Sequence, residues 1–182
     1  RLLDYHMLVV PGGFSYGDDL GAGTLWALDL RERLGNDVQD FVQRGRPVLG
    51  ICNGFQALVK AGLLPGELSR TENSEQRTAN IEQRTANSEQ RDGAVVTLAP
   101  NARGQFECRW VYLQANLASP CLFTRGLDDL IYCPVAHGEG RVVARDAAAL
   151  AGLDEQHLIA LRYVSADGTG AAAGYPANPN GS

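Results

Sequence analysis

The sequence contains few of the residues that build metal centres or disulfide scaffolds. Its 182 residues include four cysteines and three histidines. The cysteines stand singly, at positions 52, 108, 121 and 133, without the two-residue spacing of a zinc site. We therefore expect no metal site, and we interpret Cys108, Cys121 and Cys133 as small buried hydrophobes of a reducing compartment.

Long apolar runs and an excess of basic charge are also missing. No stretch of 18 or more apolar residues occurs, which disfavours a membrane-spanning helix, and the first residues lack the pattern of a signal peptide. Lys and Arg number 16 against 21 Asp and Glu, a net charge of -5. This balance argues against nucleic acid or an anionic membrane as the main partner. We expect a cytoplasmic protein.

The hydrophobic content is sufficient for one folded domain over residues 1–182. Hydrophobic residues make up 45% of the chain, and a chain of this length can bury a full core. The first half predicts alternating elements: buried strands over residues 5–10 and 48–51, and helices over residues 24–42 and 53–60. The second half predicts mostly strands, including one over residues 106–114 with a period of two. The order predicts an α/β fold with a β-rich addition.

A repeat between residues 70 and 91 interrupts this order. SEQRTAN at residues 74–80 returns with one change as IEQRTAN at residues 81–87, and a third copy begins at residue 88. Ile81 is the only large aliphatic residue of the repeat. The seven-residue period therefore lacks the row of apolar side chains that a coiled coil buries. We interpret residues 70–91 as a low-complexity, solvated insertion without a role in chemistry.

The sharpest local motif surrounds Cys52. Gly50 and Gly54 flank it at two residues on either side, after an expected strand and before an expected helix. This is the spacing of a nucleophile elbow, with Cys in place of Ser. The turn strains the nucleophile and leaves room for glycine alone beside it, while the helix start supplies amide donors, that of Asn53 first. A buried packing role for Cys52 is the alternative.

Residues 11–13, Pro-Gly-Gly, follow the preceding strand and should reach the same edge of a parallel sheet. The amide of Gly13 is a candidate second oxyanion donor, although a simple turn explains the tripeptide equally well. Asp18 and Asp19 are candidate general acids, but acidic residues before a helix are more often caps.

A cysteine nucleophile normally needs a histidine base. His137 and Glu139 alternate in a glycine-rich segment, so in an extended chain both side chains point the same way. By spacing alone, Cys52, His137 and Glu139 form a candidate triad.

Four motifs together resemble the class I glutamine amidotransferases, and among them the glutaminase subunits of phosphoribosylformylglycinamidine synthase. The motifs are PGGFSYGD (residues 11–18), LGICNGFQ (49–56), FECRWV (106–111) and PVAHGEGR (134–141). The resemblance implies a flavodoxin-like, mostly parallel sheet with helices on both faces. It also implies that Cys52 forms a thioester with glutamine, that Gly13 and Asn53 line the oxyanion hole, and that Gln56 helps to hold glutamine.

The resemblance further implies partners. Ammonia would pass to a synthetase subunit that carries ATP and magnesium and converts formylglycinamide ribonucleotide to its amidine, with a small third subunit in the complex. No cofactor is expected in this chain. His137 and Glu139 would belong to a separate loop near the site rather than to the triad.

Two departures from the family pattern bear on activity. In the family, a further strand and helix precede the position that matches Arg1. A strand and a His-Pro-Glu segment follow the position that matches Ser182, and this segment supplies the family's catalytic base. We therefore expect a fragment, incomplete at both termini. A non-catalytic subunit of the same complex and an unrelated cysteine hydrolase are the alternative functions.

Overall fold

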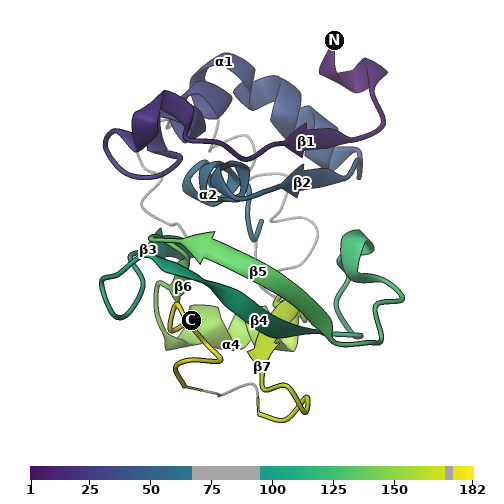
Figure 1. The fold of residues 1–182 in the computed structure, drawn as a ribbon. Coiled ribbons are helices and arrows are strands. Elements are labelled where there is room, and N and C mark those ends of the chain that lie inside the picture. The colour runs from purple at the N-terminus through teal and green to yellow at the C-terminus, as the bar shows by residue number, and fades with distance from the viewer. Residues whose placement is uncertain (67–94, 171–173) are drawn as a thin grey trace.

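The structure is a computed structural model, and it describes residues 1–66, 95–170 and 174–182. In the first half, two parallel strands lie beside two helices (Figure 1). These elements are β1 (Leu8–Val10), α1 (Thr24–Gln43), β2 (Val48–Gly50) and α2 (Asn53–Lys60). The bounds of α2 are those predicted from the sequence. The predicted insertion at residues 70–91 lies outside the described residues, so it stays a prediction.

The second half is mainly antiparallel sheet with one helix. Its elements are β3 (Val96–Ala99), β4 (Glu107–Ala115), β5 (Ile131–His137), β6 (Arg141–Ala144), α4 (Ala147–Glu155) and β7 (Leu161–Val164). Strand β3 pairs with β6, and β4 lies between β5 and β7. Short 3-10 helices cover Leu2–Asp4, Ser15–Asp18 and Leu122–Thr124.

The connections explain which strands are parallel. Parallel neighbours need a crossover, usually a helix, and α1 supplies it between β1 and β2. The β4–β5 connection contains only the 3-10 helix Leu122–Thr124, and these strands run antiparallel. The α/β class is therefore confirmed, but within the described residues the parallel part of the sheet consists of β1 and β2 alone.

Helices α1 and α2 pack on the face of this parallel pair that carries Leu8, Val10 and Val48. Val10 is 2% exposed, whereas the next residue toward the N-terminus, Val9, points to the other face and is 46% exposed. The expectation of helices on both faces is thus met on one face only by the described residues.

A second core cluster joins α2 to the β-rich half. Val59 of α2 is buried with Val96, Leu98 and Leu153, which come from β3 and α4. Helix α2 therefore has apolar contacts on two sides, since Ala57 and Leu58 belong to the first cluster. This double packing holds α2 between the two halves.

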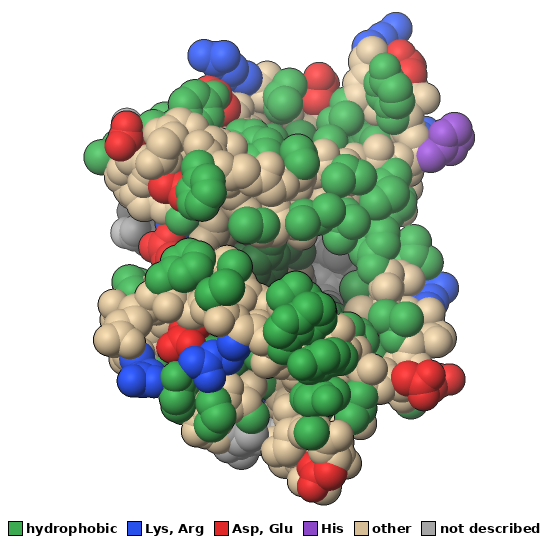
Figure 2. Space-filling model, in the orientation of Figure 1, with side chains coloured by type: hydrophobic (Ala, Val, Ile, Leu, Met, Phe, Trp, Pro, Cys, Tyr) green, Lys and Arg blue, Asp and Glu red, His purple; other side chains and the backbone are tan. Residues whose placement is uncertain are grey.

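Strand β4 has the predicted period of two, and its buried face is the one with Glu107 and Val111. The opposite face carries aromatic residues: Trp110 and Tyr132 are 58% and 55% exposed and stack at 4.8 Å. Figure 2 shows hydrophobic side chains gathered over this part of the molecule. Cys108 lies on the same exposed face, so the expectation that it is buried is wrong, and Cys121 and Cys133 are only partly buried.

Candidate active site

Cys52 occupies the turn between β2 and α2 in a conformation that side chains rarely adopt. Its φ is 52° and its ψ is -115°, and the side chain is exposed. A non-glycine residue held outside the common regions costs about 1–3 kcal/mol, and such strain concentrates at functional sites. The predicted elbow is therefore present, and the alternative of a buried packing role for Cys52 is wrong.

The two glycines around Cys52 are required by contacts with backbone and core atoms. A Cβ at Gly54 would lie 2.0 Å from the carbonyl oxygen of Val10, and one at Gly50 would lie 2.6 Å from Cδ1 of Leu58. Real Cβ atoms do not approach other atoms so closely. The glycines thus allow β1, β2 and α2 to meet closely enough to form the turn.

The loop after β1 lies next to Cys52, at the carboxyl edge of the parallel pair. The amide of Ile51 donates to the carbonyl of Val10 at 3.0 Å, and a Cβ at Gly12 would lie 3.1 Å from Cβ of Cys52. Gly13 follows with φ 143° in open space. No described residue accepts a hydrogen bond from the amide of Gly13 or of Asn53, so both donors are unpaired within the described part of the chain.

The side chain of Asn53 is 1% exposed and holds the loop before α1. Its Nδ2 donates to Oδ1 of Asp18 at 2.8 Å, and its Oδ1 accepts from the amide of Ser15 at 3.2 Å. A buried amide needs such partners because desolvation without them is costly. Asp18 is therefore a hydrogen-bond acceptor for Asn53. It does not cap α1, whose N-cap residue is Gly23.

Gln56, one turn further along α2, connects Asn53 to the loop after β5. Its Oε1 accepts from Nδ2 of Asn53 at 3.1 Å, and its Nε2 donates to the carbonyl oxygen of Glu139 at 2.8 Å. The carboxylate of Glu139 in turn accepts from the amide of Ala22 at 3.0 Å and pairs with Lys60 at 3.3 Å. The structure thus brings Asn53, Gln56 and Glu139 into one hydrogen-bonded network.

The imidazole of His137 makes its hydrogen bond outside this network. Its Nδ1 lies 3.0 Å from Oδ1 of Asn101, while its Nε2 is buried without a partner among the described residues. Burial lowers the pKa of His137, against smaller opposing effects of its backbone and of Glu107. Within the described residues Cys52 has no hydrogen bond to His137 or Glu139, so the triad suggested by spacing is not assembled.

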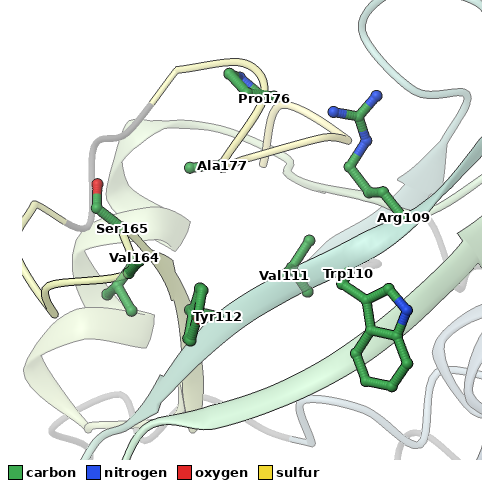
Figure 3. Close-up of a pocket in the computed structure, with 9 residues that line it drawn as sticks. Arg109, Trp110, Val111, Tyr112, Val164, Ser165, Pro176 and Ala177 are labelled. Atoms are coloured by element: carbon green, nitrogen blue, oxygen red, sulfur yellow. The ribbon is translucent and has the colours of Figure 1, made fainter.

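A cavity lies in a different part of the molecule, beside β4. It measures about 250 Å³ and is lined by Arg109, Tyr112 and Ser165, among others. Figure 3 shows Arg109 and Trp110 on opposite sides of β4, with Pro176 and Ala177 of the C-terminal loop across the cavity. No elbow residue lines it, so its residues carry no part of the argument for Cys52.

Among residues 1–66, 95–170 and 174–182, no group of three or more His, Cys, Asp or Glu side chains could hold a metal ion. In the same part of the chain no helix is long and apolar enough to cross a bilayer.

Comparison with known proteins decides the family. Residues 1–182 match the model of the CobB/CobQ-like glutamine amidotransferase domain. The chain belongs to this glutamine amidotransferase family. The resemblance seen in the four sequence motifs, and the fold class that it implied, are thereby confirmed at the level of the family.

Relatives and a solved structure are similar to this amidotransferase domain. Two proteins named phosphoribosylformylglycinamidine synthase subunit PurQ match it. That of Dehalococcoides mccartyi is 40% identical over 181 residues, which are 100% of this chain and 60% of that protein. That of Treponema denticola is 43% identical over 193 residues, covering 98% of this chain and 63% of that protein. The chain thus spans about three fifths of the length of the curated relatives that it matches.

The solved structure is described as PurLQS from Thermotoga maritima. It aligns with a TM-score of 0.54 and 32% sequence identity, covering 79% of this chain and 53% of that one. This structural similarity is a second line of support for the amidotransferase fold, in addition to the sequence match.

Two residues, one beside Cys52 and one in the Asn53–Gln56–Glu139 network, were not expected from the sequence. Gly12, rather than Gly13, is the glycine in closest approach to Cys52; the tripeptide alone does not distinguish them. Lys60 lies on the same face of α2 as Asn53 and Gln56, and the spacing of three and four residues could have revealed it.

Proposed function

We propose that this amidotransferase domain hydrolyses glutamine through Cys52 and supplies ammonia for the conversion of formylglycinamide ribonucleotide to its amidine in de novo purine biosynthesis. The observation that carries the proposal is the strained, exposed Cys52 between two obligatory glycines. The similarity to subunits named PurQ supports the choice of acceptor pathway.

The chemistry follows from the elbow. The Cys52 thiolate attacks the side-chain carbonyl carbon of glutamine, and the developing oxyanion accepts hydrogen bonds from the free amides of Gly13 and Asn53. The leaving nitrogen takes up the proton that the thiol lost, the C–N bond breaks and ammonia departs, which leaves a thioester between Cys52 and the glutamyl group. Water then attacks the thioester carbon, releasing glutamate and restoring the thiol.

Gln56, His137 and Glu139 form the surroundings of this reaction. Both polar atoms of the Gln56 side chain are occupied, by Asn53 and by the carbonyl of Glu139. We therefore assign to Gln56 the placing of the Glu139 backbone against a bound glutamine. His137 supports the same loop from behind through Asn101, which also donates to the His137 carbonyl at 2.8 Å.

Partners complete the proposal. A synthetase subunit would use ATP and magnesium for the amidation, with a small third subunit in the complex, while the glutaminase half needs neither cofactor. All four cysteines are free thiols, which agrees with the reducing conditions of the cytoplasm.

A non-catalytic subunit that retains the fold and the docking surface is the second candidate. It is favoured by one observation: within the described residues no histidine or carboxylate hydrogen-bonds to Cys52. Co-purification with a synthetase, without glutamine hydrolysis by the assembled complex, is the result that would support it over the first.

The first experiment treats the purified chain with a diazo-ketone analogue of glutamine and locates the adducts by peptide mass spectrometry. Cys108 is the internal control because it is also exposed but lies on β4. We expect the analogue to label Cys52 alone and iodoacetamide to label both thiols, with no analogue adduct in Cys52→Ala and retained labelling in His137→Ala. Equal labelling of the two thiols by the analogue would refute a glutamine pocket at the elbow.

A further inference from the structure

Lys60 is the only lysine in the sequence, and it ends helix α2, which begins directly after Cys52. It lies four residues after Gln56, which itself lies three residues after Asn53, so the three polar side chains share one face of the helix. Asn53 and Gln56 each hold a separate loop. Lys60 was not among the residues that the motifs singled out.

The ammonium group of Lys60 has an acceptor for each of its three protons. Nζ donates to the carbonyl of Ala22 at 2.7 Å, to Oγ1 of Thr24 at 3.3 Å and to Oε2 of Glu139 at 3.3 Å. A lysine has three donors and no acceptor, so this environment satisfies it fully. The Lys60 and Glu139 side chains are 18% and 24% exposed, so the pair is shielded from much of the solvent that weakens surface ion pairs.

These contacts join segments that are far apart in the sequence. Ala22 and Thr24 belong to the start of α1, and Glu139 follows β5 more than 100 residues later. The carboxylate of Glu139 also accepts from the amide of Ala22 at 3.0 Å, so Glu139 and Lys60 both bind the segment before α1. The Lys60–Glu139 pair therefore connects α2, the segment before α1 and the loop after β5.

We infer that Lys60 is a positioning residue that fixes the 138–140 loop against α2 and thereby sets the affinity of the site for glutamine. The inference rests on the proposed function, in which the backbone at Glu139 lies against bound glutamine. Lys60 touches neither Cys52 nor the oxyanion donors, so it acts on binding and leaves the intrinsic reactivity of the thiol unchanged.

The test replaces Lys60 by Met, which keeps a long side chain and removes the charge. In the complete amidotransferase complex we expect the KM for glutamine to rise by roughly threefold to a hundredfold, the range for residues coupled in one network, with kcat changed much less. In the isolated chain, the KI of the diazo-ketone analogue at Cys52 should rise, while the rate of Cys52 alkylation by iodoacetamide stays the same.

Two controls separate positioning from general damage. Arg44→Met removes one cation from the Arg44–Asp40 pair, whose side chains are 60% and 53% exposed, and it should leave KM and KI unchanged. Lys60→Arg retains a cation and should restore most of the affinity. A Lys60→Arg variant as defective as Lys60→Met, or a Lys60→Met variant with unaltered KM and KI, overturns the inference.

A measurement without glutamine keeps the two proposals apart. Hydrogen exchange should quicken at residues 20–24 and 138–140 in Lys60→Met. Lysine labelled with carbon-13 gives one side-chain signal in this chain, which should shift in Glu139→Gln. If the diazo-ketone analogue does not label Cys52 in the wild-type chain, the proposed function fails. The role of Lys60 is overturned independently if hydrogen exchange is unchanged in Lys60→Met and the lysine signal does not shift in Glu139→Gln.

Discussion

Replacing Gly54 by Ala tests whether close packing forms the elbow. The new Cβ would lie 2.0 Å from the oxygen of Val10 and 2.6 Å from that of Pro11. Both are backbone atoms at the end of β1, where the strand is held by pairing with β2. The clash can be relieved only by moving β1 away from α2, which also disturbs the core at Val10.

The expected cost is at least about 3 kcal/mol, the upper part of the range for inserting one methyl group into a packed interior. The total stability of a domain of this size is about 5–15 kcal/mol, so Gly54→Ala should unfold at much lower urea concentration or fail to fold. Two other glycines serve as reference positions, because a Cβ added at either of them has fewer close contacts.

Gly45→Ala and Gly35→Ala are the matched variants. Gly45 has φ +70° with nothing within 4 Å of an added Cβ, so its cost should be the left-handed backbone strain of roughly 1–2 kcal/mol. Gly35 lies inside α1, with its nearest contact at 4.0 Å. Alanine there should stabilise by about 0.5–1 kcal/mol.

Urea unfolding followed by circular dichroism gives the three free-energy changes in one assay. We expect Gly54→Ala to be the least stable, then Gly45→Ala, with Gly35→Ala more stable than the wild type. A Gly54→Ala protein as stable as Gly45→Ala would refute the claim that contact with β1 demands glycine at the elbow.

Three further outcomes are expected. Burial lowers the pKa of His137 below its ordinary 6.5. The unfolded chain therefore binds a proton at this residue more readily than the folded chain, and the free energy of unfolding falls as the pH drops through that value. His137→Asn should reduce the loss of Tm between about pH 7.5 and 5.5, and an unchanged loss would contradict this. Asp146 accepts from the amide of Ala149 at 2.7 Å at the start of α4, so Asp146→Ala should lower the Tm slightly while Asp146→Asn retains most of it. Deletion of residues 71–90 should leave complex formation and glutamine hydrolysis intact, and a collapse of either would show that the repeat has a role.

The local signals in the sequence determined most of the secondary structure. The bounds of α2 are those expected, and α1 ends two residues before Gly45, which has the positive φ of a C-terminal cap residue. The period of two at residues 107–115 is a strand in the structure. Such features depend on neighbours within one or two turns, so the sequence contains them directly.

The elbow was also predictable because its geometry is local. The spacing of Gly50, Cys52 and Gly54 implies a tight turn between strand and helix, and the structure places Cys52 there with positive φ. Which face of β4 is buried was not predictable, because an alternating pattern does not identify the buried face. In the structure the face with Glu107 and Val111 is buried, and the Glu107 carboxylate there pairs with Arg109 at 2.7 Å.

Only the tertiary structure decided what Cys52, His137 and Glu139 do relative to one another. The sequence places His137 two residues from Glu139, yet the imidazole turns to Asn101 and the carboxylate to Lys60, each from an element distant in the chain. Spacing determines the direction of side chains only while the backbone stays extended, and β5 ends at His137. The sequence alone thus determined the turn that carries Cys52, while long-range contacts determined which groups His137 and Glu139 contact.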